Sequence, residues 1–268
     1  MNIETLGTVY FLGIGGIGMS ALARYLKKAG VNVHGYDKTP TTLTSQLEAE
    51  GIVIHYEDRP ELIPAETSLV VYTPAVPADL GEFQFLKLKN IPMIKRSALL
   101  GEITSAKKTL AIAGTHGKTT VTTMLSHILF PSEMGCTAFL GGIAKNYNSN
   151  LLLNPQSNFM VAEADEFDRS FLKLFPYLAI VTATDADHLD IYKTHAQLLD
   201  SFADFTANIE QGGFLLVKQG ITLPEKIKER VSKYTYAVTD QADFMAIGLQ
   251  LRDACYSFSL KTPDGIIE

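Results

Sequence analysis

Short apolar runs alternate along most of this chain with segments whose apolar residues recur every three or four positions. The runs predict buried strands, and the periodic segments predict helices with one apolar face. We expect strands at residues 8–12, 31–36, 52–56, 69–72, 91–94, 109–113, 159–162, 178–183, 214–217 and 234–238. We expect helices at residues 42–50, 83–90, 97–103, 202–209 and 227–231, with two more directly after glycine-rich turns. This alternation predicts an α/β fold with parallel sheets.

The pattern changes near the end of the sequence. From residue 244 to residue 260 the side chains alternate imperfectly, which predicts antiparallel strand. Thr262-Pro263-Asp264-Gly265 is a strong hairpin signal, and only three residues follow it. So short a return strand leaves its partner's edge unpaired, so we expect the intact protein to continue beyond Glu268. Earlier in the chain, residues 140–143 predict a flexible turn.

A turn with two glycines separates the strand at 109–113 from a helix. The helix shows an apolar face of Val121, Met124, Leu125, Ile128 and Leu129. Such a turn leaves backbone N–H groups at a helix N-terminus, where the helix dipole favours an anion. Lys118 can reach terminal phosphates, and the Thr119 hydroxyl can bind Mg²⁺. The usual phosphate loop, G-x-x-x-x-G-K-[ST], has its first glycine where this chain has Ile112. The alternative is a glycine-rich turn with a surface lysine, but the strand–turn–helix context favours a nucleoside-triphosphate site. Its candidate residues are Gly114, Thr115, His116, Gly117, Lys118, Thr119 and Thr120.

An earlier turn, Gly13-Ile14-Gly15-Gly16-Ile17-Gly18, matches G-x-G-x-x-G between a strand and a helix. Asp37 ends the next strand, as in βαβ units that bind dinucleotides. The motif specifies a turn that accommodates phosphate and not the molecule attached to it, so NAD is one reading among others. Asp37 either contacts a ribose or base or caps a turn. Thr73 and Pro74 open a loop that is either a wall of this site or a rigid proline turn.

Acidic residues follow two strands of the second half. Residues 163–168 hold four carboxylates, which require positive charge nearby or exposure to water. Residues 184–190 contain Asp185, Asp187, His188 and Asp190. If these strands lie beside the one before the phosphate loop, Mg²⁺ bound to a triphosphate accounts for the acidic groups and Lys118 together. Alternatively, Glu163 is a capping or loop carboxylate and His188 is a structural histidine.

Composition restricts the functional classes. The chain has 268 residues, 46% of them hydrophobic and 19% charged, which predicts a globular protein with one large or two medium domains. A net charge of −6 argues against nucleic acid as the main partner. Two cysteines without a CxxC partner imply no disulfide framework or zinc site. The first ten residues do not read as a secretory signal and no apolar stretch reaches membrane-spanning length, so we expect a cytoplasmic protein without a membrane partner.

The ordered motifs resemble those of the Mur ligases. The resemblance rests on residues 11–20 (FLGIGGIGMS), 114–120 (GTHGKTT), 163–166 (EADE) and 187–190 (DHLD). The late-glycine loop, which departs from the general pattern, matches the family pattern. Many relatives carry an asparagine where this chain has Ala183 and Thr184. The resemblance implies a Rossmann-like UDP-sugar-binding domain at residues 1–106 and a truncated P-loop-type ATP-binding domain at residues 107–268, with a small antiparallel element. The amino-acid-binding domain of the family would be absent.

The resemblance also implies a reaction. The family joins an amine to a carboxylate by way of an acyl phosphate made from ATP, here in peptidoglycan precursor synthesis. Within the family the motifs are most similar to those of ligases that add L-alanine to UDP-N-acetylmuramate. A ligase that attaches a ready-made tripeptide in murein recycling is the alternative, and an NAD-dependent oxidoreductase is a second one. The implied catalytic residues are Lys118, Glu163 and His188, and the implied Mg²⁺ ligands are Thr119, Glu163 and His188. The implied UDP-sugar site comprises Gly13, Ile14, Gly15, Gly16, Ile17, Gly18, Asp37, Thr73 and Pro74.

Overall fold

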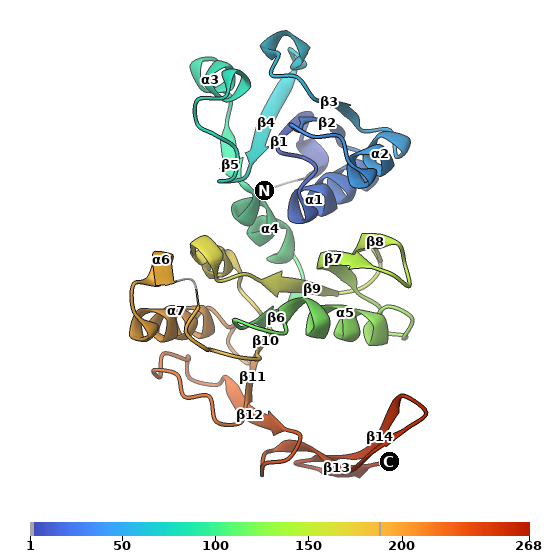
Figure 1. The fold of residues 1–268 in the computed structure, drawn as a ribbon, viewed down its shortest axis with the longest axis vertical. Helices are drawn as coiled ribbons and strands as arrows, with labels where there is room; N and C mark the ends of the chain where they lie inside the picture. The colour runs from blue at the N-terminus through green and yellow to red at the C-terminus, as the bar shows by residue number, and fades with distance from the viewer. Residues whose placement is uncertain (1–2, 188) are drawn as a thin grey trace. The chain divides into compact units, whose positions relative to one another are not determined.

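A computed structural model describes residues 3–187 and 189–268 of the chain (Figure 1). The chain folds into two compact units. Unit 1 comprises the residues up to 107 together with 122–162, and unit 2 comprises 108–121 together with 163–268. The domain boundary expected between residues 106 and 107 stays a prediction. Among the described residues, no helix combines the length and the apolar character needed to cross a membrane.

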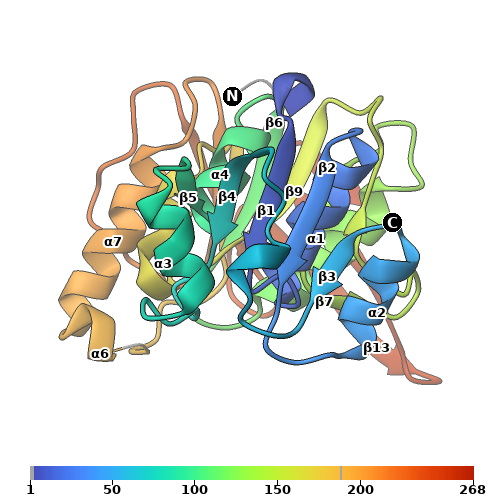
Figure 2. The same ribbon diagram turned by 90° about the horizontal axis from the view of Figure 1, so that it is seen from above.

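Unit 1 contains a five-stranded parallel sheet, as the sequence predicts. Its strand order is β3-β2-β1-β4-β5, with β1 between β2 and β4 (Figure 2). Leu12 pairs with Tyr36 on one side and with Tyr72 on the other, so three carboxyl ends meet at one edge of the sheet. The strands are β1 (Thr8–Leu12), β2 (Asn32–Tyr36), β3 (Val53–His55), β4 (Thr67–Tyr72) and β5 (Met93–Lys95).

Helices connect these strands. In α1 (Ile17–Lys28), the apolar residues Met19, Leu22 and Leu26 are buried, and so are all the other residues from Ser20 to Arg24. The Thr41 side chain accepts a hydrogen bond from the Thr44 backbone and Thr44 returns one, so a capping box starts α2 (Thr42–Ala49). The remaining helical elements of this part are η1 (Ile3–Thr5), η2 (Pro60–Leu62), α3 (Gly81–Leu88) and α4 (Arg96–Thr104).

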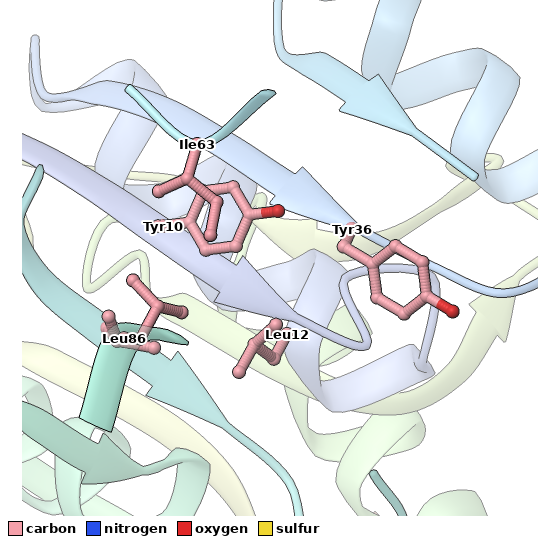
Figure 3. Close-up of a cluster of buried hydrophobic side chains, with 6 residues drawn as sticks. Tyr10, Leu12, Tyr36, Ile63 and Leu86 are labelled. Carbon is pink, nitrogen blue, oxygen red and sulfur yellow. The ribbon is translucent and has the colours of Figure 1, made fainter. Parts of the chain in front are cut away.

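One hydrophobic cluster of unit 1 lies where β1, β2 and α3 meet (Figure 3). It is built from Tyr10, Leu12, Tyr36, Ile63, Val70 and Leu86. The buried Tyr10 hydroxyl donates a hydrogen bond of 2.5 Å to Glu82, whose other oxygen lies 2.6 Å from His55 Nε2. Burial, with the Glu82 carboxylate second, raises the pKa of Tyr10. The polar end of this tyrosine is therefore satisfied inside the core.

The remainder of unit 1 corrects two expectations. Residues 140–143 are not a turn, because they belong to β7 (Thr137–Ala144), which pairs antiparallel with β8 (Ser149–Leu152) and parallel with β9 (Phe159–Ala164). The β7–β8 register shifts between Phe139 and Ala144, which accommodates the glycine pair as an irregularity within the strand.

The second correction concerns α5 (Lys118–Leu129). The helix is present, but Met124 and Ile128 of the expected buried face are 60% and 66% exposed. Thr122 and Ser126 are buried instead. The Ser126 hydroxyl donates to the Thr122 carbonyl at 2.6 Å, so the polar group is satisfied within the helix. Val121, Leu125 and Leu129 of the expected face are half-buried, and the two short side chains complete the packed face, which periodicity of apolar residues could not indicate.

Unit 2 also contains a parallel sheet. Its parallel strands follow the order β13-β12-β11-β10-β6. The helix expected at 227–231 is wrong, because the chain there has no helical turn and Arg230 has a φ of +68°. The elements are β6 (Lys108–Ala113), η3 (Phe167–Lys173), β10 (Leu178–Val181), α6 (Leu189–Tyr192), α7 (His195–Ala207), β11 (Phe214–Lys218) and β12 (Ser232–Ala237).

The end of the chain forms an antiparallel element, as expected. It comprises β13 (Phe244–Arg252), β14 (Cys255–Thr262) and β15 (Gly265–Ile267). The predicted turn at 262–265 joins β14 to β15. The alternating stretch is two strands and not one, since Arg252 pairs with Cys255 across Asp253 and Ala254, both of which have positive φ.

The two cysteines differ in burial. Cys136 is buried and Cys255 is exposed, and burial raises the pKa of the Cys136 thiol to about 11. Thiolate is the reactive form, so we expect a disulfide reagent at pH 8 to modify one thiol of the native chain rapidly and the other only after unfolding. Cys255→Ser should remove the rapid phase in an absorbance assay, and a rapid phase that persists in this variant would contradict the assignment.

Candidate functional site

The phosphate loop of unit 2 lies between β6 and α5. Gly114 has a φ of +137° and Gly117 a φ of +82°. Residues other than glycine rarely adopt these backbone conformations. Space is also restricted at Gly114: a Cβ atom there would lie 2.2 Å from Thr182 Oγ1 and 2.8 Å from the Ala183 nitrogen. The loop conformation therefore depends on glycine at position 114, where the family pattern has it.

The chain segment after β10 fixes this loop. The Thr182 hydroxyl donates to the His116 carbonyl at 2.5 Å, and the Thr115 nitrogen donates to the Ala183 carbonyl at 3.0 Å. The Thr115 hydroxyl accepts a hydrogen bond from the Asp185 nitrogen at 3.1 Å. Ala183 acts through its backbone carbonyl, so this contact does not depend on which side chain stands at position 183.

Lys118 is the first residue of α5 and forms a buried ion pair. Its ammonium lies 2.8 Å from Glu166 Oε2 and 3.0 Å from Oε1, and it also donates to the Gly114 carbonyl at 2.8 Å. The Lys118 side chain is 13% exposed and the Glu166 side chain 0%. This pair places a positive charge among the carboxylates of residues 163–168. The sequence predicts either such a charge or the exposure of these carboxylates to water.

Thr119 and Glu163 bring two kinds of oxygen together. The Thr119 hydroxyl donates to both carboxylate oxygens of Glu163, at 3.0 and 3.1 Å. Glu163 is the penultimate residue of β9, directly before Ala164. Burial raises the pKa of Glu163, while the bond from Thr119 and the charge of Lys118 act in the opposite direction. A cation bound beside this carboxylate would stabilise its charged form.

The donor set fits a hard divalent cation. A hydroxyl and a carboxylate are oxygen ligands of the kind that Mg²⁺ takes together with phosphate oxygens and water. Within residues 3–187 and 189–268, no group of three His, Cys, Asp or Glu side chains could hold a metal ion by itself.

The glycine loop of unit 1 is held by Asp37. The Gly15 nitrogen donates to Asp37 Oδ2 at 2.7 Å, and the Thr39 nitrogen donates to Oδ1 at 3.1 Å. Both carboxylate oxygens therefore cap backbone turns, which is one of the two roles left open by the sequence. A Cβ atom at Gly18 would lie 2.9 Å from Arg96 Nη1, so the glycine leaves room for this guanidinium beside the first turn of α1. Arg96 adds positive charge where a helix N-terminus favours an anion.

A pocket of about 610 Å³ adjoins this loop. Gly13 and Gly16 line it from the loop, and Thr73 lines it from the segment after β4. The Ile14 side chain is fully buried in the core and contributes no surface to the pocket. Pocket-lining residues outside the predicted set include Tyr36, Lys38, Val76 and Leu80. The volume lies in the range of small-molecule sites, which makes this pocket the candidate substrate site of unit 1.

Both glycine loops lie in segments that match models of the same protein family. Residues 8–108 match the family described as "Mur ligase family, catalytic domain", and residues 112–268 match the "Mur ligase middle domain". The chain belongs to the Mur ligase family. It is 49% identical to the UDP-N-acetylmuramate–L-alanine ligase of Parabacteroides distasonis over 98% of this chain and 58% of that protein. It is 50% identical to the corresponding ligase of Phocaeicola vulgatus over 100% of this chain and 59% of that protein.

Solved Mur ligase structures share the fold. The UDP-N-acetylmuramate–alanine ligase of Thermotoga maritima superimposes with a TM-score of 0.82 at 26% identity, over 95% of this chain and 58% of that one. A ligase from Neisseria meningitides that acts on UDP-N-acetylmuramate and a tripeptide gives a TM-score of 0.84 at 22% identity, over 98% of this chain and 86% of that one. The latter likeness concerns the fold alone. This Mur ligase chain spans less than three fifths of the length of the curated relatives cited above.

The structure brings Lys118, Thr119 and Glu163 of the predicted ATP site together. His116 is exposed, with Nε2 3.9 Å from Asp185 Oδ2, and Thr120 is exposed on the first turn of α5. His188, predicted as a catalytic residue and metal ligand, lies outside the described residues. Sequence reasoning did not assign Glu166 or Arg96 to a site. The acidic run contained Glu166, but only the fold shows which of its carboxylates faces Lys118.

Proposed function

We propose that this chain supplies the UDP-sugar and ATP sites of a ligase that joins L-alanine to the carboxylate of UDP-N-acetylmuramate in peptidoglycan precursor synthesis. The observation that carries the proposal is the contact of Thr119 with Glu163 beside the Lys118 ammonium, at a loop shaped for phosphate. Identity near 50% to ligases named for this reaction supports the choice of substrates. The tripeptide ligase shares the fold at 22% identity, which is a weaker argument for that alternative.

In the proposed reaction, a carboxylate oxygen of the muramate attacks the γ-phosphorus of ATP, and ADP leaves with the electron pair of the broken P–O bond. The amine of L-alanine then attacks the acyl carbon of the acyl phosphate. The tetrahedral intermediate expels phosphate, and the nitrogen loses a proton. The first step brings a carboxylate toward a polyanion, so neutralising positive charge is the main requirement.

The residues of unit 2 meet this requirement in distinct ways. Lys118 neutralises charge on the β- and γ-phosphates, and backbone N–H groups at the start of α5 orient them. Thr119 and Glu163 would hold Mg²⁺, which supplies additional charge neutralisation when bound. Glu166 keeps the Lys118 ammonium at the loop. His188 is proposed to serve a second metal ion by the family resemblance alone.

In unit 1, the diphosphate of UDP-N-acetylmuramate is proposed to lie on the loop from Gly13 to Gly18. The N-terminus of α1 and Arg96 provide the positive potential. Asp37 shapes the loop through the Gly15 N–H group. The nicotinamide alternative predicts saturable binding of NADH. The ligase proposal predicts saturable binding of UDP-N-acetylmuramate and none of NADH in a calorimetric titration.

We further propose that these 268 residues bind UDP-N-acetylmuramate, and ATP weakly, without completing ligation. The curated relatives named for the whole reaction are longer, and this chain spans less than three fifths of their length. Phosphate release from ATP should therefore not respond to L-alanine when the purified chain is supplied with UDP-N-acetylmuramate. Release that depends on L-alanine would contradict the proposal.

The metal assignment predicts the effect of Thr119→Val. The side chain is exposed, so the fold should be retained, but one oxygen ligand is lost. We expect the gain in ATP affinity that Mg²⁺ produces to fall about tenfold. Calorimetric titrations with Mg²⁺ and with EDTA measure this gain. Thr123→Val, one turn further along α5, should leave it unchanged, and an undiminished gain in Thr119→Val would contradict the assignment.

A further inference from the structure

Asn150 of β8 is a fully buried polar residue in the segment that matches the Mur ligase middle domain. Its side-chain nitrogen donates to the Ile17 carbonyl at 2.7 Å and to the Ser20 hydroxyl at 2.8 Å. Both partners lie in the first turns of α1, directly after the glycine loop. A side chain more than 125 residues away in the sequence thus holds the helix that begins the UDP-sugar site.

The oxygen of Asn150 is also engaged. It accepts a hydrogen bond from Arg24 Nη1, and Arg24 is 5% exposed. The Arg24 guanidinium also contacts the C-terminal end of α2. Its Nε lies 2.9 Å from Oε1 of Glu50, the residue after the helix, and its Nη2 lies 3.0 Å from Gln46 Oε1. Every hydrogen bond of this network lies within unit 1. Buried polar side chains with all partners satisfied fix one arrangement of the elements they join.

One ring contact joins α1 to β7, the strand that pairs with β8. The ring of Tyr25 on α1 lies 5.4 Å from the ring of Phe139 on β7, measured between centroids. This ring contact lies in the second half of the helix, whereas Asn150 contacts its first turns. The direction of the N–H groups at the start of α1 depends on those first turns, and these N–H groups are the donors available to a diphosphate.

We propose that Asn150 is a positioning residue for the diphosphate of the nucleotide-sugar substrate, acting through the first turn of α1. The inference rests on the proposed function of the unit 1 pocket. It assigns to that site a residue from outside the segment that matches the family's first domain, residues 8–108. Asn150 does not touch the ligand: it sets the orientation of groups that do.

The test compares ligands with and without the diphosphate. Asn150→Leu keeps the branched shape of the side chain with a larger volume, and it removes the side-chain N–H donors together with the oxygen that accepts from Arg24. We expect it to raise the Kd of UDP about tenfold, because two hydrogen bonds to α1 are lost, and to leave the Kd of uridine within about twofold. A variant damaged in overall fold would weaken both ligands alike, so the ratio of the two constants is the decisive readout. ATP affinity at unit 2 should not change.

Gln46→Ala is the matched control, because Gln46 contacts the same arginine but not the first turn of α1. We expect the Kd of UDP to stay within about twofold of wild type. Should Asn150→Leu not fold, Ser20→Ala removes one partner of Asn150 more gently, and the ratio should shift in the same direction. Equal ratios in the wild type and in the folded Asn150 or Ser20 variant would overturn the inference and leave the proposed function standing. A wild-type chain that binds neither UDP-N-acetylmuramate nor UDP would overturn both.

Discussion

Lys118→Met should weaken ATP binding about 100-fold or more, because the variant loses charged hydrogen bonds to the phosphates. It should also lower the free energy of unfolding by about 3–5 kcal/mol, since Glu166 is left buried without its counter-charge. The Lys118 ammonium lies 2.8 Å from this carboxylate, whose side chain is 0% exposed. Calorimetry measures the first effect and urea denaturation the second.

The double variant Lys118→Met, Glu166→Gln separates these effects. It removes both charges, so we expect most of the lost stability to return while ATP binding stays weak. This outcome would show that loss of binding follows from the missing ammonium and not from unfolding. ATP affinity within about threefold of wild type in either variant would contradict the assigned role of Lys118. A double variant no more stable than Lys118→Met would contradict the assigned role of the buried pair.

Gly114→Ala should abolish measurable ATP binding. Alanine at a φ of +137° is strained, and its Cβ would lie 2.2 Å from Thr182 Oγ1 and 2.8 Å from the Ala183 backbone nitrogen. The loop must therefore leave the conformation that the contacts from residues 182–185 impose. Thr182→Ala should not rescue the variant, because the contact with backbone remains. Binding is measured by calorimetry and folding by circular dichroism.

Gly212→Ala is a control matched for backbone conformation. Gly212 also lies in unit 2 with a positive φ of +80°, but nothing lies within 4 Å of a Cβ atom there. We expect a loss of about 1 kcal/mol in stability from the strained backbone and no change in ATP affinity. Full ATP binding by Gly114→Ala would contradict the account of the phosphate loop. Equal loss of binding in both variants would show that strain alone, and not the close approach to Thr182 and Ala183, decides the effect.

Periodicity predicted most elements of the fold and failed where other forces determine the structure. The strand β7 contains two adjacent glycines, which read as a turn because pairing with β8 and β9 is not visible locally. The turn between β13 and β14 uses Asp253 and Ala254 at positive φ without the usual glycine, so it gave no signal. The fully buried positions of α5 are Thr122 and Ser126, which the spacing of apolar residues could not indicate. Each failure is a case of tertiary packing overriding local preference.

Some features of the candidate sites could likewise be predicted from the sequence, and others could not. Glycine spacing and strand ends located both loops, and the contact of Thr119 with Glu163 agrees with the expectation that strand ends converge. The pairing of Lys118 with Glu166, the capping role of Asp37 and the position of Arg96 needed the fold, because each depends on which neighbour a side chain faces. The exposure of His116 was likewise undetermined by its place in the motif.

The central claim is that Lys118, Thr119 and Glu163 jointly bind a magnesium-bound triphosphate. The most direct measurement is a crystal structure of this chain with Mg²⁺ and a non-hydrolysable ATP analogue. The account predicts a metal ion bound to the Thr119 hydroxyl and the Glu163 carboxylate, with the Lys118 ammonium on the terminal phosphates. A triphosphate bound away from the loop at residues 114–119, or a metal ion held by neither Thr119 nor Glu163, would contradict it.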